Sequence, residues 1–336
     1  MVEEIGRTLR GIRRARGKSL DVVAGLAGIS KSYLSRLESG DRALDRRSLV
    51  VALADALEVA PSEITGSALA TPRERADDRA LQEVRSALLA VSLGEPHGEV
   101  QPVDQLRARV ASVVAAQNDA ESAAVGAALP ALIRDLHTTV DARGGVDVLR
   151  LLPLAHVQGT QAWLTAVGAP IDLSWQAVLL GRRAAERAAE PIPHAVSAYG
   201  TALGLLSAGA FGHASHVLAR VELPARTTEE IQLSGSLVLA SSLVSAARGD
   251  HSEQSAALEH AAELSERTGE TNMLGFGFGP SNVAVWRMQG ALESGDHSEA
   301  AEIAERVRPD ALPVRAPGRV LAGVRESTRP TAETAR

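Results

Sequence analysis

A short run near the N-terminus, residues 30–36, holds side chains that could bind DNA. Hydrogen-bond donors of the kind that reach base edges in the major groove recur there at helical spacing: Lys31, Ser32, Ser35 and Arg36. Ser30 precedes them and is expected to cap a helix, whose free backbone N–H groups suit a phosphate. Tyr33 could place its hydroxyl on the DNA backbone. The alternative is that these are solvated residues on an ordinary amphipathic helix.

Two short helices must hold these side chains, and residues 20–39 carry the pattern of such a pair. The first helix is expected to bury residues three and four apart: Leu20, Val23, Ala24 and Ala27. Gly28 ends it, because glycine adopts the positive φ of a tight turn. The second helix, residues 30–39, buries Leu34 and Leu37 on the face opposite to the donors. The pattern therefore predicts a helix-turn-helix whose second helix enters the major groove.

Residues 2–66 resemble the Cro/repressor-type (XRE) helix-turn-helix domain. Four stretches carry the resemblance: residues 9–17, 19–30, 33–40 and 48–64. The resemblance implies a five-helix DNA-binding domain in which Lys31, Ser32 and Arg36 read bases. Leu20 departs from the family, which often has a phosphate-binding glutamine at that position, and a leucine cannot make that contact.

Basic residues that follow the second helix are candidate phosphate clamps: Arg42, Arg46 and Arg47. The resemblance assigns phosphate contacts to such loop arginines and also to Ser30 and Tyr33. Any one surface arginine is as often simply solvated. Arg13 and Glu38 are expected to form an ion pair between the first helix and the recognition helix, a structural pairing in the family.

The composition favours helices packed on helices. The chain has 336 residues, of which 45% are hydrophobic but only 2% aromatic, and it has no cysteine. A chain of this length suggests two or three domains, and few aromatic residues argue against a β-sandwich. We expect an all-α protein without disulfides, cofactor or metal. The N-terminus has no apolar core of the signal-peptide kind, and the cytoplasm, at the nucleoid, is the expected location.

Charge is divided unevenly along the chain. Residues 1–47 carry a net charge of +5, whereas the rest carry −11. A basic N-terminal part followed by an acidic remainder is expected when only the N-terminal part binds DNA phosphates. The expected division is into a DNA-binding domain, a linker, a helical repeat domain and a poorly ordered tail: residues 1–66, 67–79, 80–312 and 313–336. Helical periodicity predicts helices in the third part, among them residues 80–92, 103–116, 122–143, 146–167 and 174–190.

The C-terminal half contains an internal repeat. Residues 249–253, Gly-Asp-His-Ser-Glu, recur at 295–299, and a weaker copy lies at 209–213. The glycine is expected to turn the chain between two helices and the aspartate to begin the next, which predicts an α-solenoid of tetratricopeptide type. Residues 149–164 and 279–296 resemble the repeat region of actinobacterial XRE regulators. That resemblance implies a domain that senses a ligand or partner.

A glycine-rich loop in this region suggests a ligand groove rather than a nucleotide site. Gly275, Gly277 and Gly279 follow no predicted strand and precede no Lys-Ser/Thr pair, so phosphate binding is not favoured. The groove is expected to be lined by four nearby side chains: Phe276, Phe278, Asn282 and Trp286. His213 and His216 lack a carboxylate that would complete a metal site.

Two uncharged stretches, residues 151–171 and 192–219, are long enough to span a membrane. Prolines and polar residues interrupt both, so we expect buried helices instead. No spacing assembles a catalytic triad, and an enzyme is not expected. We expect a regulator that binds double-stranded operator DNA as a homodimer and responds to a peptide, small molecule or protein partner. The alternative is a DNA-tethered interaction scaffold or an antitoxin-like partner protein.

Overall fold

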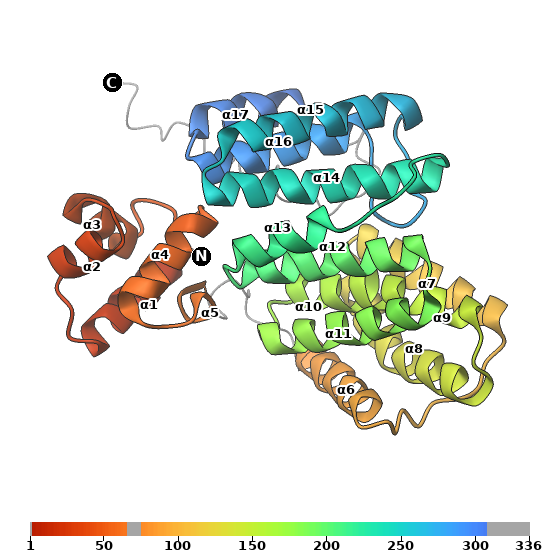
Figure 1. The fold of residues 1–336 in the computed structure, drawn as a ribbon. Helices are drawn as coiled ribbons and strands as arrows, with labels where there is room; N and C mark the ends of the chain where they lie inside the picture. The colour runs from red at the N-terminus through yellow and green to blue at the C-terminus, as the bar shows by residue number, and fades with distance from the viewer. Residues whose placement is uncertain (1, 66–74, 308–336) are drawn as a thin grey trace.

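The computed structural model describes residues 2–65 and 75–307, which form helices joined by turns and loops (Figure 1). No strand occurs in either range. The predicted all-α class is therefore confirmed. The predicted tail, residues 313–336, lies outside the described residues, as does most of the predicted linker at 67–79.

Five helices form the N-terminal part, which we call the head: α1 (Val2–Ala15), α2 (Leu20–Leu26), α3 (Lys31–Ser39), α4 (Arg47–Leu57) and α5 (Pro61–Thr65). They enclose one apolar cluster in which Leu34 and Leu53 are fully buried. Ser19 and Ser30 cap α2 and α3, because each side chain accepts a hydrogen bond from a backbone N–H three residues later. Gly28 turns the chain between these two helices with a φ of 68°, as the sequence predicts.

Helix α1 packs closely against α3. A Cβ atom on Gly6 would lie 2.4 Å from the carbonyl oxygen of Leu37, so the approach requires glycine. Arg13 of α1 donates from Nη2 to Oε2 of Glu38 at 2.8 Å and from Nε to the other carboxylate oxygen. Both side chains are largely buried. The predicted ion pair is confirmed, and it ties α1 to the helix that carries the candidate DNA-binding residues.

The remaining described residues, 75–307, form a helical region that we call the body. Its first part consists of α6 (Arg75–Ser92), α7 (Val103–Asn118), α8 (Ser122–Arg143), α9 (Val146–Leu154), the π-helix η2 (Ala155–Gln161) and α10 (Ala162–Ala166). Trp163 is fully buried in the apolar cluster of this part. Its ring lies against α8 at Gly126, where a Cβ atom would come within 2.6 Å of the indole.

A π-helical segment divides residues 146–167, which the sequence predicts to be one helix. Pro153 lies inside α9 and has no backbone N–H to donate, and the wider π pattern begins two residues later. His156 is fully buried in this segment, and its Nε2 lies 2.9 Å from Nε2 of His137 on α8. Among the described residues, neither its Nδ1 nor Oε1 of Gln161 has a hydrogen-bond partner. Segments of this kind are frequent at functional sites.

The second part of the body consists of α11 (Ile171–Ala188), α12 (Pro191–Ser207), α13 (Phe211–Ala219), α14 (Thr228–Arg248), α15 (His251–Thr268), α16 (Pro280–Ser294) and α17 (His297–Arg306). Gly249 and Gly295 end α14 and α16 with positive φ. Asp250 and Asp296 then cap α15 and α17 by accepting a backbone N–H three residues later. The repeated sequence therefore forms two helical hairpins, as predicted, and α14–α17 form one group at the top of the view in Figure 1.

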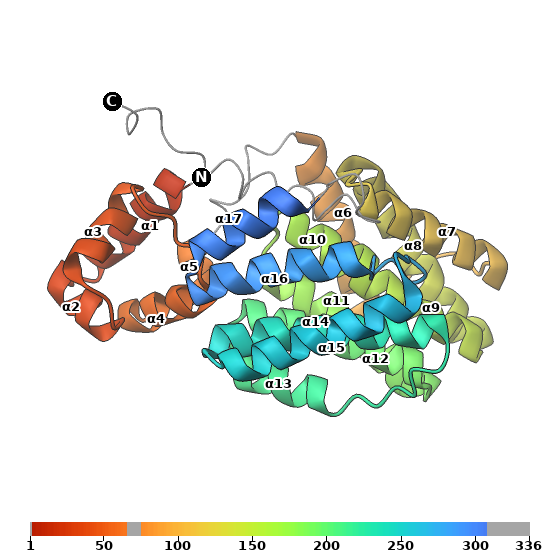
Figure 2. The ribbon, with the colours of Figure 1, turned by 90° about the horizontal axis from the view of Figure 1, so that it is seen from above.

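The head contacts the body through α4 and the turn before it. Helices α2 and α3 lie on the far side of the head in both views (Figures 1 and 2). Val51 of α4 packs on Gly209 between α12 and α13, where a Cβ atom would lie 2.6 Å from Cγ2 of the valine. The recognition helix is thus turned away from the body.

One described helix, α14, is long and apolar enough to cross a membrane by length and composition. However, 78% of its apolar window is buried inside the protein. A core helix of a globular protein passes the same test, so this helix is weak evidence for a membrane span. The uncharged stretch 151–171 is mostly buried among other helices, and most of 192–219 is buried or half-buried.

Candidate DNA interface

Helix α3 presents a polar face away from the core of the head. Leu34 and Leu37 are buried on its inner face. The four side chains predicted to reach base edges are exposed on the other side: Lys31, Ser32, Ser35 and Arg36. The structure therefore brings these residues together on one accessible helix face.

The N-terminal end of α3 is held by short-range contacts. Oγ of Ser30 accepts a hydrogen bond from the backbone N–H of Tyr33 at 3.2 Å and lies 3.1 Å from Oγ of Ser32. Nζ of Lys31 lies 2.8 Å from Oδ2 of Asp21, with 59% and 65% of the two side chains exposed. An exposed pair contributes about 0–1 kcal/mol. Lys31 can therefore exchange its carboxylate for a DNA group at low cost.

The three predicted clamp arginines face different surroundings. Arg42 is exposed, and its guanidinium carbon lies 6.0 Å from the centre of the Tyr33 ring, beside α3. Arg46 and Arg47 turn toward the body instead. The structure therefore places only Arg42 with the exposed residues of the recognition helix.

Arg47 is bound to Glu293 of α16. Its backbone N–H donates to Oε2 of the glutamate at 2.6 Å, and its Nη1 donates to Oε1. Only 3% of the Glu293 side chain is exposed; burial raises the pKa of this carboxyl, and the arginine opposes that rise. The Arg46 guanidinium lies beside Gly295 at the C-terminus of α16, where helix carbonyls carry partial negative charge. In this arrangement both side chains therefore lie against the body rather than on a free surface beside α3.

Sequence reasoning missed the acid that holds Arg47. Glu293 and Arg287 are the only charged residues of α16, and a buried acid requires a partner. That signal indicates that a partner exists but does not say which residue it is. A second contact supports the same junction, because Nδ1 of His297 lies 3.6 Å from Oδ2 of Asp45.

The four residues predicted to line a ligand groove are buried or half-buried within the body. Phe278 is fully buried. Phe276 packs edge-on against Tyr199, with ring centres 4.9 Å apart. Asn282 is buried, and Trp286 packs against two apolar clusters. The three aromatic side chains therefore contribute to packing within the body.

Metal-ligating side chains do not gather in the described part of the chain. Over residues 2–65 and 75–307, no group of three or more His, Cys, Asp or Glu residues is placed to hold an ion. His213 and His216 are both exposed.

Comparison with known proteins bears on the head. Residues 4–65 match the family model described as a helix-turn-helix domain, and the match coincides with α1–α5. The head is a helix-turn-helix domain. No curated protein matches the sequence. Among solved structures, the SHP pheromone receptor Rgg2 of Streptococcus dysgalactiae matches at 12% identity over 97% of this chain and 98% of that chain. The TM-score is 0.29, too low to show a shared arrangement of helices.

Proposed function

We propose that this protein is a sequence-specific, DNA-binding transcription regulator. The exposed polar face of α3 carries the proposal, because a helix-turn-helix head presents it on the side away from the body. We assign base contacts in the major groove to Lys31, Ser32, Ser35 and Arg36. We assign phosphate contacts to the N-terminus of α3 at Ser30, to Tyr33 and to Arg42.

Arg46 and Arg47 have a different proposed role. In the arrangement described above, both are held at the C-terminal end of α16. Residues directly before α4 follow the recognition helix closely, so a head that leaves the body would present both arginines to the DNA backbone. The junction would then compete with DNA for the same two side chains.

The body is proposed to dimerise and to sense a ligand or partner. A single head contacts a short stretch of DNA, so a palindromic site bound by a dimer suits this architecture. The proposed division is a DNA-binding domain at residues 1–66, a linker at 67–79 and helical repeats at 80–312. We propose that these repeats correspond to the tetratricopeptide-like region of actinobacterial XRE regulators. The acidic balance outside residues 1–47 supports this division, because it keeps the body from lying on phosphate.

The proposal is tested by recovering the DNA site with the full-length protein. Genomic fragments that bind the protein are captured and sequenced, and the enriched site is titrated by fluorescence anisotropy while light scattering gives the oligomeric state. One palindromic site bound by a dimer is expected. Arg36→Ala should lose affinity for it, whereas the exposed body residue Arg182 changed to alanine should not. Enrichment of no sequence, with stoichiometric capture of one protein, would support a scaffold or antitoxin-like partner instead.

A further inference from the structure

A cleft of about 660 Å³ lies between the two parts of the body. Sites for small molecules commonly measure roughly 300–1,000 Å³. Helices α7 and α9, the start of α12 and the loop at residues 272–275 line most of it. The lining is largely apolar and includes Val110, Val114, Leu151, Leu154, Ile192 and Leu274. The cleft therefore suits a molecule with an apolar body.

One face of α7 runs along the length of the cleft. The residues that line it recur at helical spacing, at positions 107, 110, 111, 114, 115 and 118. Arg107 stands at one end of this row and Asn118 at the other. A rise of about 1.5 Å per residue separates their Cα atoms by about 16 Å. An elongated occupant with polar groups at its ends would match this row.

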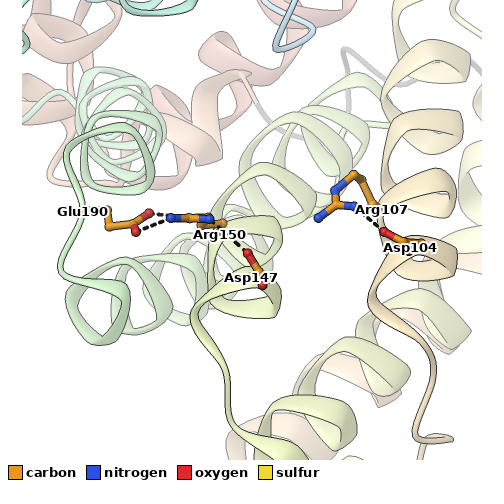
Figure 3. Close-up of polar contacts among 5 residues, drawn as sticks. All are labelled: Asp104, Arg107, Asp147, Arg150 and Glu190. Carbon is orange, nitrogen blue, oxygen red and sulfur yellow. Dashed lines mark hydrogen bonds and ion pairs between the residues drawn. The ribbon is translucent and has the colours of Figure 1, made fainter.

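Two arginines reach the cleft from equivalent positions of a repeated sequence. Val-Asp-x-Leu-Arg begins both α7 and α9. In each copy the aspartate pairs with the arginine three residues later, as Asp104 with Arg107 and Asp147 with Arg150 (Figure 3). In Figure 3 the Arg107 side chain extends from α7 toward the side on which Arg150 lies. Both arginines line the cleft.

The two guanidinium groups differ in how firmly they are held. Arg150 donates two hydrogen bonds to the carboxylate of Glu190 (Figure 3) and holds the pKa of that carboxyl below its usual value. Within the described residues Arg107 pairs with Asp104 alone, and that aspartate is 92% exposed. A pair with so exposed an acid is weak, and the remaining N–H groups of Arg107 can bind an incoming anion. Arg107 is therefore the available anchor, beside a fixed Arg150.

The opposite end of the cleft offers a polar side chain. Asn118 is 8% exposed and lines the cleft, so its amide can meet the far end of an occupant. The loop closes over α7 at this end, because a Cβ atom on Gly275 would lie 2.1 Å from Cγ1 of Val114. Gly275 therefore allows the loop at residues 272–275 to pack closely against α7 beside the cleft.

We propose that this cleft binds an elongated apolar molecule that ends in a carboxylate. The carboxylate pairs with Arg107, the apolar chain lies along Val110 and Val114, and the far end reaches Asn118. A medium-chain acyl acid supplies this chemistry. So does an apolar peptide of four or five residues with a free C-terminus, since an extended chain spans about 3.3–3.6 Å per residue. The inference rests on the proposed role of the body as a sensor and names the chemistry that it senses.

Calorimetric titration of the full-length protein tests the proposal. The probes are decanoate, 1-decanol, and an apolar pentapeptide with a free or an amidated C-terminus. At least one free acid should bind, and its uncharged analogue should bind at least tenfold more weakly. The acid that binds identifies the source of the carboxylate. Binding of neither acid would overturn the proposal.

Variants locate the site. Arg107→Gln should weaken binding of the acid at least tenfold and leave its uncharged analogue unchanged. Arg182→Gln is the matched control, because Arg182 is also 55% exposed and paired within its helix, but lies outside the cleft. Ala115→Leu, at an exposed position in the cleft, should weaken both the acid and its analogue. Equal affinities of the two arginine variants for the acid would refute the site. No DNA is present, so failure of DNA recognition and failure of this site are distinguishable.

Discussion

Lys31 and Arg47 are both paired with carboxylates, but burial gives the two pairs different consequences. Asp21 is exposed, so it stays hydrated when Lys31 leaves it. Glu293 is buried, so losing Arg47 would leave a desolvated carboxylate without a partner. Lys31 is therefore available to DNA at all times. Arg47 is available only when the head separates from the body.

Base contacts and phosphate contacts should respond differently to substitution. We expect Lys31→Ala and Arg36→Ala each to weaken binding to the cognate site by about 1–3 kcal/mol and to relax discrimination at particular base pairs. Arg42→Ala should weaken binding evenly across sequences and lower the slope of log affinity against log salt by about one. Anisotropy titrations over a set of mutated sites and salt concentrations measure both effects. Identical profiles for all three variants would contradict this assignment of roles.

The Arg13–Glu38 pair should stabilise the head. Arg13→Met leaves Glu38 buried without its cation, and we expect the free energy of unfolding to fall by about 3 kcal/mol. Urea denaturation followed by circular dichroism measures the change. Arg79→Met, which breaks an exposed pair with Glu83, is the control and should change stability by less than about 0.5 kcal/mol. Equal losses in the two variants would show that burial of the pair has no effect.

At the scale of elements, short sequence signals determine where helices begin and end. The helix type between those ends also depends on packing against neighbouring helices. Ser30 begins α3 and Gly295 ends α16 by hydrogen bonding within a few residues. The π-helix η2 depends on neighbours as well. Its buried His156 meets His137 of α8, and no local signal specifies that pairing.

The histidine pair makes stability depend on pH. Burial, with a smaller effect of Arg187, lowers the pKa of His137 to about 4 from an ordinary value of 6.5. Between these values the unfolded chain binds the proton and the folded chain does not. The free energy of unfolding should therefore fall as pH drops from 6.5 to 4, by about 3 kcal/mol from this group.

Urea titrations of the wild type and His137→Gln test this dependence. The difference in unfolding free energy between the two proteins should shrink as the pH falls through this window. His260→Gln, at an exposed histidine, is the control for the substitution itself. A constant difference for His137→Gln would show that this residue is not held neutral by burial.

At the scale of the whole molecule, one junction links the head to the body. Glu293 of α16 binds Arg47, Gly295 directly after α16 lies beside Arg46, and Gly209 packs against Val51. The recognition helix lies on the opposite side of the head (Figure 2). A change in the body that moves α16 would therefore reach the head through α4.

Neutralising the acid of this junction should strengthen binding to DNA. In Glu293→Gln the charge that holds Arg47 is lost, and we expect tighter binding to non-specific DNA with a salt slope steeper by about one. Glu259→Gln removes the same charge from an exposed position of the body and is the matched control. Anisotropy at several salt concentrations compares the two variants. An equal gain in both would mean that net charge, rather than release of Arg47, is responsible.

Local signals allowed much of the head and the hairpins to be predicted. Capping serines, turn glycines and apolar spacing act within one or two helical turns, so they can be read along the chain. Local signals did not show how Phe276 and Phe278 pack, because a phenylalanine has the same apolar character whether it lines an opening or fills a core. The Val-Asp-x-Leu-Arg repeat of α7 and α9 can be recognised in the sequence. That its two arginines line the same cleft depends on how α7 and α9 pack.

The amino-acid sequence by itself determined the helix-turn-helix, its polar outer face, the Arg13–Glu38 pair and the two Gly-Asp hairpins. Only the tertiary structure decided that Arg47 pairs with an acid 246 positions away and that Arg107 and Arg150 meet at one cleft. The reason is physical. Hydrogen bonds at helix ends join neighbours in the chain, whereas the partner of a buried charge is whichever group the packing of helices brings to it.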